Sequence, residues 1–301
     1  MPSPQIFDRQ LLRMRRRRAA ARGPATFLID RVAEDLADRL AAVLRHFPLA
    51  VDLASPGDAV LRTLAASPAI GTLIAVAPAA DRLPQRAGLT VAGDEEALPF
   101  RDASLDLVVS ALTLQFVNDL PGTLAQVRRA LRPDGLFLAA LIGGDSLTEL
   151  RQSFATAEAE VEGGVSPRVA PFADLRDMGA LLQRADFALP VVDVDRLVVR
   201  YRSPFALMQD LRRMGATNAL TERRRTPLRR ATLQRMAEIY ADRFSDADGH
   251  IRATFEIIWL SGWAPHESQQ KPLAPGSAAR RLADALGTRE LPAGDKAGRS
   301  R

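Results

Sequence analysis

The sequence predicts an α/β fold built on a doubly wound, mainly parallel sheet of seven strands. Short apolar runs of strand length alternate with segments in which apolar residues recur every three or four positions. The clearest unit spans residues 105–142, where two apolar runs flank a helical segment that ends at Arg132-Pro133-Asp134-Gly135. Strand, helix and strand in this order form a βαβ unit, which places parallel strands in one sheet.

The remaining elements follow from the same periodicities. Strands are predicted at residues 49–54, 71–76, 89–92, 105–110, 136–142, 191–201 and 251–262. Helices are predicted at 27–47, 58–66, 121–131, 146–161, 173–185, 204–214 and 229–244. Pro48 ends the first helix, and Ser146 with Glu149 is typical of a capping box. The last strand should run antiparallel near the edge of the sheet, and the two helices before it should cap the crevice.

The predicted organisation has three parts. Residues 1–47 form an amino-terminal helical extension, and residues 48–272 form the α/β domain with a helical cap at about 203–245. Residues 273–301 form an Ala/Arg-rich tail with late Gly and Pro, which we expect to be mostly disordered.

Composition excludes several kinds of protein. No apolar run is long enough to span a bilayer, so we expect a soluble chain. The sequence has no cysteine, which excludes disulfides and thiolate sites and fits a reducing compartment. The three histidines lie far apart without metal-ligand spacing, so we expect no metal site.

Basic residues gather in two arginine runs, 15–18 and 223–225, although the net charge is only +5. Aromatic residues make up 5% of the chain and do not interleave with either run, as base stacking on nucleic acid would require. We therefore expect solvated or protein-docking surfaces and no nucleic-acid partner.

The segment 91–144 resembles the second half of the S-adenosylmethionine (SAM) dependent methyltransferase fold. The matching words are D-x-x-x-L-P-F at Asp94–Phe100, D-L-V-V-S at Asp106–Ser110 and R-x-L-R-P-D-G at Arg129–Gly135. The resemblance implies a Rossmann-like sheet with SAM at the carboxyl ends of its strands. In that family the position of Asp94 lies beside the adenine.

The first half departs from the family pattern. After the first strand the acid is present as Asp52, but Ala54, Pro56 and Asp58 stand at the glycine positions. The second strand ends at Ala77-Pro78 without the acid that would bind the ribose hydroxyls, and Asp81 follows three residues late. Either SAM binds weakly through what remains, or the fold has kept its shape and changed its ligand.

The polar residues at the strand ends are the candidates for cofactor binding: Asp52, Ser55, Gly57, Asp94, Glu95 and Ser110. Asp94 is the strongest of these, whereas Glu95 and Glu96 are expected nearer the surface. For catalysis the candidates are His266 and Glu267, which follow the last strand in a polar segment. That segment is expected at one rim of the crevice, where His266 would be a general base.

Two further motifs narrow the resemblance to one family: F-D-R-x-L-L-R-x-R-R at Phe7–Arg16 and H-E-S-Q-x-K-P at His266–Pro272. Together they resemble the methyltransferase-like assembly factor five family of respiratory complex I, over about residues 5–278. This resemblance implies hydroxylation of an arginine on a peripheral-arm subunit of complex I. It also implies a bacterial protein of the cytoplasm, held at the inner membrane only through complex I.

Two alternatives stay open. The malonyl carrier-protein methyltransferases of biotin synthesis share the core motifs and a word like the one at Asp145–Arg151, but they lack the H-E-S-Q tail. A conventional SAM methyltransferase of this or another acceptor specificity is therefore one alternative. The other is a non-catalytic assembly chaperone that uses the fold as a binding surface.

Overall fold

The computed structural model describes residues 5–78, 89–270 and 282–288, in two units, Met1–His266 and Glu267–Arg301. The first unit holds the sheet and all the helices described below. In the second unit the structure describes one short helix, α9 (Leu282–Leu286). Most of the predicted tail at 273–301 lies outside the described residues. Within the described part, no helix combines the length and apolar character needed to cross a membrane.

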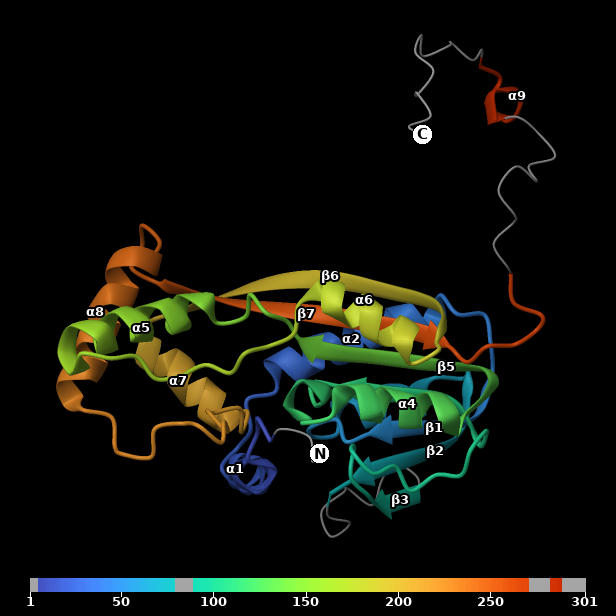
Figure 1. Cartoon of the computed structure of the whole chain (residues 1–301), viewed down its shortest axis with the longest axis horizontal. Helices are drawn as coiled ribbons and strands as arrows, with labels where there is room; N and C mark the ends of the chain where they lie inside the picture. Colours follow the sequence, from blue (N-terminus) through green and yellow to red (C-terminus); the bar gives the residue numbers. More distant parts are fainter. Residues whose placement is uncertain (1–4, 79–88, 271–281, 289–301) are drawn as a thin grey trace, which may run out of the picture. The chain divides into compact units, whose positions relative to one another are not determined.

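The predicted α/β fold is confirmed: seven strands form one sheet in the order β3-β2-β1-β4-β5-β7-β6 (Figure 1). The strands are β1 (Phe47–Leu53), β2 (Ile70–Ala77), β3 (Leu89–Ala92), β4 (Leu105–Ala111), β5 (Leu131–Ile142), β6 (Ala188–Tyr201) and β7 (Ile251–Trp263). The first five run parallel, and β7 pairs antiparallel with both β5 and β6. The sheet therefore reverses direction at β7, as the sequence predicted.

Both faces of the central strands are covered by helices, which explains their nearly continuous apolar sequences. On one face the helices are α2 (Phe27–Ala41), α3 (Ala59–Ala66), α5 (Thr148–Glu162), α7 (Pro204–Arg213) and α8 (Arg230–Phe244). On the other face the helices are α4 (Leu120–Ala130) and α6 (Leu175–Arg184). Neighbouring residues of β1 accordingly belong to different cores, Ala50 to the first and Val51 to the second.

The amino-terminal helix prediction was wrong at its end. The helix α2 stops at Ala41, and Phe47 already belongs to β1, where its N–H donates to the Ala69 carbonyl at 2.6 Å. Pro48 disfavours helical backbone at the preceding residue, so Phe47 adopts an extended conformation and enters the sheet. A further helix, α1 (Arg9–Ala21), precedes α2.

The predicted capping box at Ser146 and Glu149 was also wrong. The helix α5 begins at Thr148, after Leu147 in left-handed backbone. The Ser146 hydroxyl pairs with the backbone of Glu256, and the Glu149 carboxylate accepts hydrogen bonds from Thr254. Both side chains therefore join the start of α5 to β7 instead of closing a helix end.

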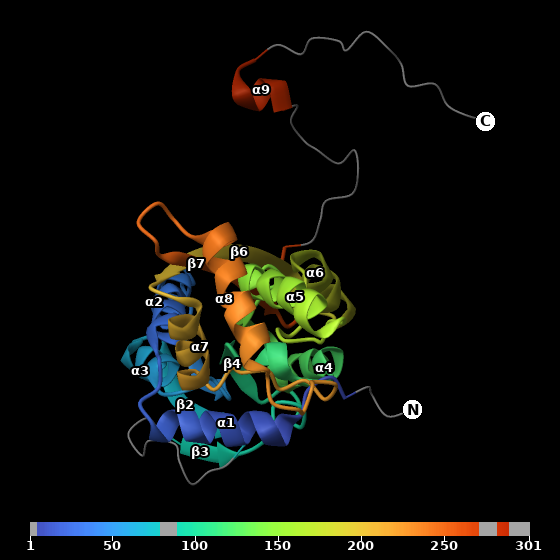
Figure 2. The same cartoon turned by 90° about the vertical axis from the view of Figure 1, so that its left-hand side faces the viewer.

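The β6–β7 ladder extends beyond the rest of the sheet. Pairing of β5 with β7 ends at Ile142–Ile257, whereas β6 and β7 stay paired as far as Tyr201–Ile251. The helices α5 and α8 pack on each other beside this extension. Seen from this end, α1, α5, α7 and α8 lie in front of the strands (Figure 2).

Candidate functional site

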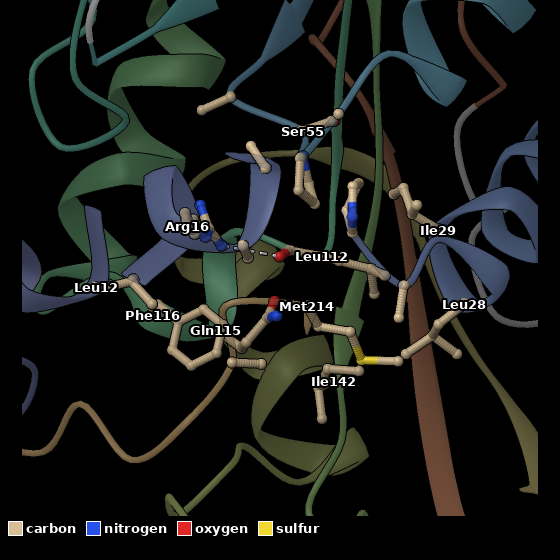
Figure 3. A pocket seen from close by; sticks show the side chains of 18 of the residues that line it. Leu12, Arg16, Leu28, Ile29, Ser55, Leu112, Gln115, Phe116, Ile142 and Met214 are labelled. Atoms are coloured by element: carbon tan, nitrogen blue, oxygen red, sulfur yellow. Dashed lines mark hydrogen bonds between the residues drawn. The ribbon is translucent and has the colours of Figure 1, made fainter. Parts of the chain in front are cut away.

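A cavity of about 650 Å³ lies at the carboxyl ends of the central strands, where open α/β sheets bind ligands. Its wall comes from α1, the start of α2, the loops after β1 and β4, the ends of β2 and β5, and α7 (Figure 3). Many of its side chains are apolar, among them Leu12, Leu28, Ile29, Phe116, Ile142 and Met214. A cavity of this volume suits a small organic ligand.

The loop after β1 is held in place by neutral hydrogen bonds. Its Ala54 N–H donates to the Val76 carbonyl at 2.9 Å, and the Thr113 hydroxyl donates to the Ala54 carbonyl at 2.6 Å. The Ser55 hydroxyl oxygen accepts the Ala111 N–H at 2.9 Å. These bonds join the loop to β2 and to the end of β4, so its backbone is fixed from both sides.

Two predicted residues support this loop from below. Asp52 is 2% exposed, and burial raises the pKa of its carboxyl to about 6 against the opposing effect of the Ser55 hydroxyl and N–H. Ser110 is fully buried, and its hydroxyl donates to the Leu53 carbonyl at 2.9 Å. Neither residue lines the cavity. Their place in the structure is that of supports for the loop.

Two other predicted residues, Ser55 and Gly57, do line the cavity. Gly57 has φ +75°, and Ala54 has φ 59°, which is left-handed backbone that favours glycine. Ala54 stands at the first glycine position of the methyltransferase pattern. The loop therefore keeps a glycine conformation at a position where the side chain is a methyl group.

The acidic turn after β3 faces the arginines of α1. The Arg9 guanidinium contacts Asp94 at 2.7 Å, Glu95 at 2.7 Å and Glu96 at 2.5 Å, and Arg13 contacts Asp94 at 2.5 Å. Burial alone would raise the pKa of Asp94. The hydrogen bond from the Glu96 N–H and the two guanidiniums outweigh burial, and the pKa lies below its usual value.

The expectation that Glu95 lies near the surface was wrong, because it is 3% exposed and lines the cavity. Its Oε2 atom is buried without a hydrogen-bond partner, and the same is true of Oε1 of Gln115, another cavity residue. Buried acceptors normally find a donor. The two atoms are therefore available to amino or hydroxyl groups of a ligand.

A further cationic group at the cavity is Arg16. Its Nη2 donates to the Leu112 carbonyl at 3.2 Å, and its guanidinium lies 5.5 Å from the centre of the Phe116 ring (Figure 3). The arginine run 15–18 was expected at the surface, so the arginines of this site were not predicted. A usable signal was present, because Arg9, Arg13 and Arg16 follow one another at steps of four and three, which is one helical face.

The polar segment at His266 does not begin at the crevice, contrary to prediction. Trp263 pairs with Leu136, and the Ala264 N–H donates to the Gly135 carbonyl, so the chain leaves β7 beside the amino end of β5. The crevice lies at the opposite end of β5. The prediction failed because β7 is antiparallel and returns the chain to the far edge. Catalytic roles for His266 and Glu267 stay predictions, and this register gives them no support.

Comparison with known proteins agrees with the resemblance to methyltransferases that the sequence motifs indicate. A family model described as a methyltransferase domain matches residues 51–139. The chain is 40% identical over 281 residues to the human protein named arginine-hydroxylase NDUFAF5, mitochondrial, covering 91% of this chain and 81% of the relative. It is 36% identical over 287 residues to the protein of the same name from Danio rerio, covering 93% and 89%.

A second set of relatives covers less of the chain. The malonyl-[acyl-carrier protein] O-methyltransferase of Xylella fastidiosa is 42% identical over 173 residues, 58% of this chain and 56% of the relative. Among solved structures, protein BH2331 of Bacillus halodurans C-125 has a TM-score of 0.54 at 16% identity, covering 77% of this chain and 98% of its own. At that identity the structural likeness shows the fold alone.

Proposed function

Because the chain belongs to the NDUFAF5 family of methyltransferase-fold proteins, we propose that it hydroxylates a protein arginine during assembly of respiratory complex I. The observation that carries this proposal is identity of 40% over 91% of the chain to a relative named an arginine hydroxylase. The match extends far beyond residues 51–139, to which the methyltransferase-domain family model is confined. The substrate we propose is an arginine on a peripheral-arm subunit of complex I.

The proposed reaction replaces a C–H bond of the arginine side chain by C–OH. This is a two-electron oxidation of the substrate, so an oxidant such as dioxygen together with an electron donor has to take part. The chain supplies a largely apolar cavity that shields reacting groups from water. Glu95 and Gln115 offer acceptors in that cavity for a substrate or cofactor that brings N–H groups.

SAM is the cofactor that the fold family implies, and the residues of the cavity fit it in part. The unpartnered acceptors of Glu95 and Gln115 suit its amino groups, and the volume suits its size. Among the described residues, the end of β2 brings only Ala77 and Pro78 to the cavity, so this part of the wall holds no acid for the ribose hydroxyls. The loss of one charged hydrogen bond lowers the binding affinity by roughly 10- to 100-fold. We propose that the chain binds SAM weakly.

For location, we propose the bacterial cytoplasm, with attachment to the inner membrane only through complex I. The relatives are named mitochondrial, which fits a protein that works where complex I is built. Its partner would be the peripheral-arm subunit that carries the target arginine.

The test is deletion of the gene in its host. Assembled complex I should fall, and mass spectrometry of peripheral-arm subunits should lose one arginine that carries an extra oxygen atom. Complementation with the wild-type gene should restore both. Normal hydroxylation and normal complex I in the deletion strain would contradict the proposal. Low complex I with unchanged arginines would point to the non-catalytic chaperone.

A second function has its own supporting observation, the 42% identity to a malonyl-carrier-protein methyltransferase over the core. The same deletion strain separates the two. If the chain methylates a malonyl thioester carrier for biotin synthesis, the strain should require biotin while NADH oxidation stays normal. We expect growth without biotin, because that relative matches only 58% of this chain.

A further inference from the structure

The charges that line the cavity are mostly positive. Five arginines and two carboxylates contribute to its wall: Arg9, Arg13, Arg16, Arg17, Arg213, Asp58 and Glu95. The surplus matters only for arginines whose charge is not already balanced by carboxylates nearby.

Most of these groups already have a charged partner. Arg9 and Arg13 bind the acidic turn after β3, as described above. Arg213 lies 3.6 Å from Asp210, one turn away on α7, and its Nε donates to the Gly23 carbonyl. Asp58 pairs with Arg62 on α3. Arg17 is exposed, so water screens its charge.

Arg16 differs from these arginines. Within residues 5–78, 89–270 and 282–288, no carboxylate lies at ion-pair distance from its guanidinium, which contacts the Leu112 carbonyl and the Phe116 ring. Burial, together with Arg9 and Arg13, lowers the pKa of Arg16 and outweighs the opposing effect of the Glu95 carboxylate. A partly buried guanidinium without a directly paired carboxylate is unfavourable, and an anion at this place would compensate it.

The surroundings fix where such an anion would sit. Leu112 follows β4 directly, and Ser55 and Pro56 of the loop after β1 line the same cavity. In Figure 3 the Arg16 guanidinium points into the cavity beside Leu112, with Gln115 close by. The guanidinium therefore lies beside the loop after β1, which stands where SAM methyltransferases have the glycine-rich turn that approaches the methionine moiety of SAM. An unpartnered acceptor, Oε1 of Gln115, lies close by.

We propose that Arg16 binds the α-carboxylate of the amino-acid moiety of the ligand in this cavity. The inference rests on the proposed SAM cofactor. A guanidinium can bind a carboxylate through two parallel hydrogen bonds, which gives both energy and orientation. Arg16 would thus distinguish SAM from nucleoside ligands that lack a carboxylate, such as adenosine.

The test compares two ligands that differ only in this carboxylate, SAM and decarboxylated SAM, by calorimetry on the full chain. Wild type should bind SAM at least about tenfold more tightly than decarboxylated SAM, as charge-assisted hydrogen bonds predict. Arg16→Met keeps much of the side chain that packs on Phe116 but removes the charge. In this variant the preference should disappear, while affinity for decarboxylated SAM should stay within about twofold of wild type.

Arg18→Met is the matched control, because Arg18 is an exposed arginine of the same helix that does not line the cavity. It should keep the preference for SAM. Arg16→Lys keeps a charge without the planar fork and should show an intermediate preference. If Arg16→Met does not fold, Arg16→Lys and the ratio of the two wild-type affinities still test the proposal.

Three results would overturn the inference. The first is that Arg16→Met retains the full preference for SAM. The second is that it loses affinity for both ligands equally, which would indicate that Arg16 only supports the cavity. Wild type could also bind both ligands equally well. In each case SAM binding survives and only the role of Arg16 fails. Wild type that binds neither ligand would overturn the cofactor proposal as well, whereas arginine hydroxylation is tested separately in the deletion strain.

Discussion

The two sides of the cavity are held by different forces. On one side, the loop after β1 is fixed by neutral hydrogen bonds to β2 and β4, with Asp52 buried beneath it. On the other side, α1 is held against the acidic turn by ion pairs of Arg9 and Arg13. Neutral bonds depend little on pH or salt, whereas ion pairs depend on both. The loop side therefore supplies a fixed backbone, and the α1 side supplies the charges that a ligand meets.

The largest effect should come from breaking the ionic side. Arg9→Met should lower the free energy of unfolding by about 3 kcal/mol or more, because it leaves Glu95 as a buried carboxylate without its cation. Their side chains are only 11% and 4% exposed, so water cannot replace the partner. Denaturant unfolding measures the change. Arg9→Lys should lose less, and Arg18→Met should lie within about 0.5 kcal/mol of wild type.

The loop side should also depend on pH, through the buried carboxyl of Asp52 and not through its neutral hydrogen bonds. Burial raises the pKa of Asp52 from 3.8 to about 6, so the folded chain holds this proton more tightly than the unfolded chain. The stability this proton provides is fully present below about pH 4 and is lost as pH rises through about 6. The neutral variant Asp52→Asn should lack this dependence.

Unfolding by urea from pH 4 to 7 measures the difference. Relative to Asp52→Asn, wild type should lose about 2–3 kcal/mol across this range, since one pKa unit corresponds to about 1.4 kcal/mol. Asp58→Asn, which changes an exposed carboxylate of the same loop, should leave the wild-type slope in place. Parallel curves for wild type and Asp52→Asn would show that Asp52 is not the titrating group.

Ligand binding distinguishes the acidic residues on the ionic side of the cavity. We expect wild type to bind SAM more weakly than micromolar, and Glu95→Gln to weaken binding about a further tenfold, which is about 1.4 kcal/mol. Glu95 lines the cavity with an unpartnered oxygen, whereas Asp94 and Glu96 do not line it. Asp94→Asn should therefore weaken binding less, and Glu96→Gln should serve as the unaffected control. Calorimetry with melting temperatures recorded in parallel decides this, and a sub-micromolar wild type would contradict it.

The sequence was sufficient to predict the strands of the sheet. The spacing of apolar residues shows which positions are buried, and this spacing differs between strands and helices. All seven strands and their alternation with helices came from apolar runs such as 105–110. The same reasoning located the crevice and the loop residues Ser55 and Gly57 that line it. The sequence also showed that Ala77-Pro78 stands at the end of β2 in place of the family's acid, because the identity of a residue can be read without a structure.

What the sequence missed depends on contacts between distant segments. Arg9 and Glu95 are far apart in the chain, and only packing of α1 over the β3 turn makes them a buried pair. Glu149 resembled a capping residue because local spacing fits that role, but Thr254 is its partner. His266 was placed at the crevice although the last strand was predicted to be antiparallel, and an antiparallel β7 ends beside the amino end of β5, away from the crevice.

The smallest predicted effect tests the backbone of the loop side. Ala54 has φ 59°, where a residue with a Cβ is disfavoured by about 1 kcal/mol or more and glycine is not. Ala54→Gly should remove this strain, but glycine also loses about 0.4–1 kcal/mol through its freer unfolded chain. The net free energy of unfolding should stay the same or rise by up to about 1 kcal/mol.

The matched control makes the same chemical change where the backbone is ordinary. Ala37 is exposed in the interior of α2, and Ala37→Gly should cost about 1 kcal/mol through lost helix propensity. Urea unfolding of the two variants gives the strain as the difference between them, because both share the cost in the unfolded chain. Equal losses would show that the loop holds Ala54 without strain. A gain at Ala54 alone would show that the neutral hydrogen bonds to Val76 and Thr113 hold the turn in a conformation that alanine disfavours.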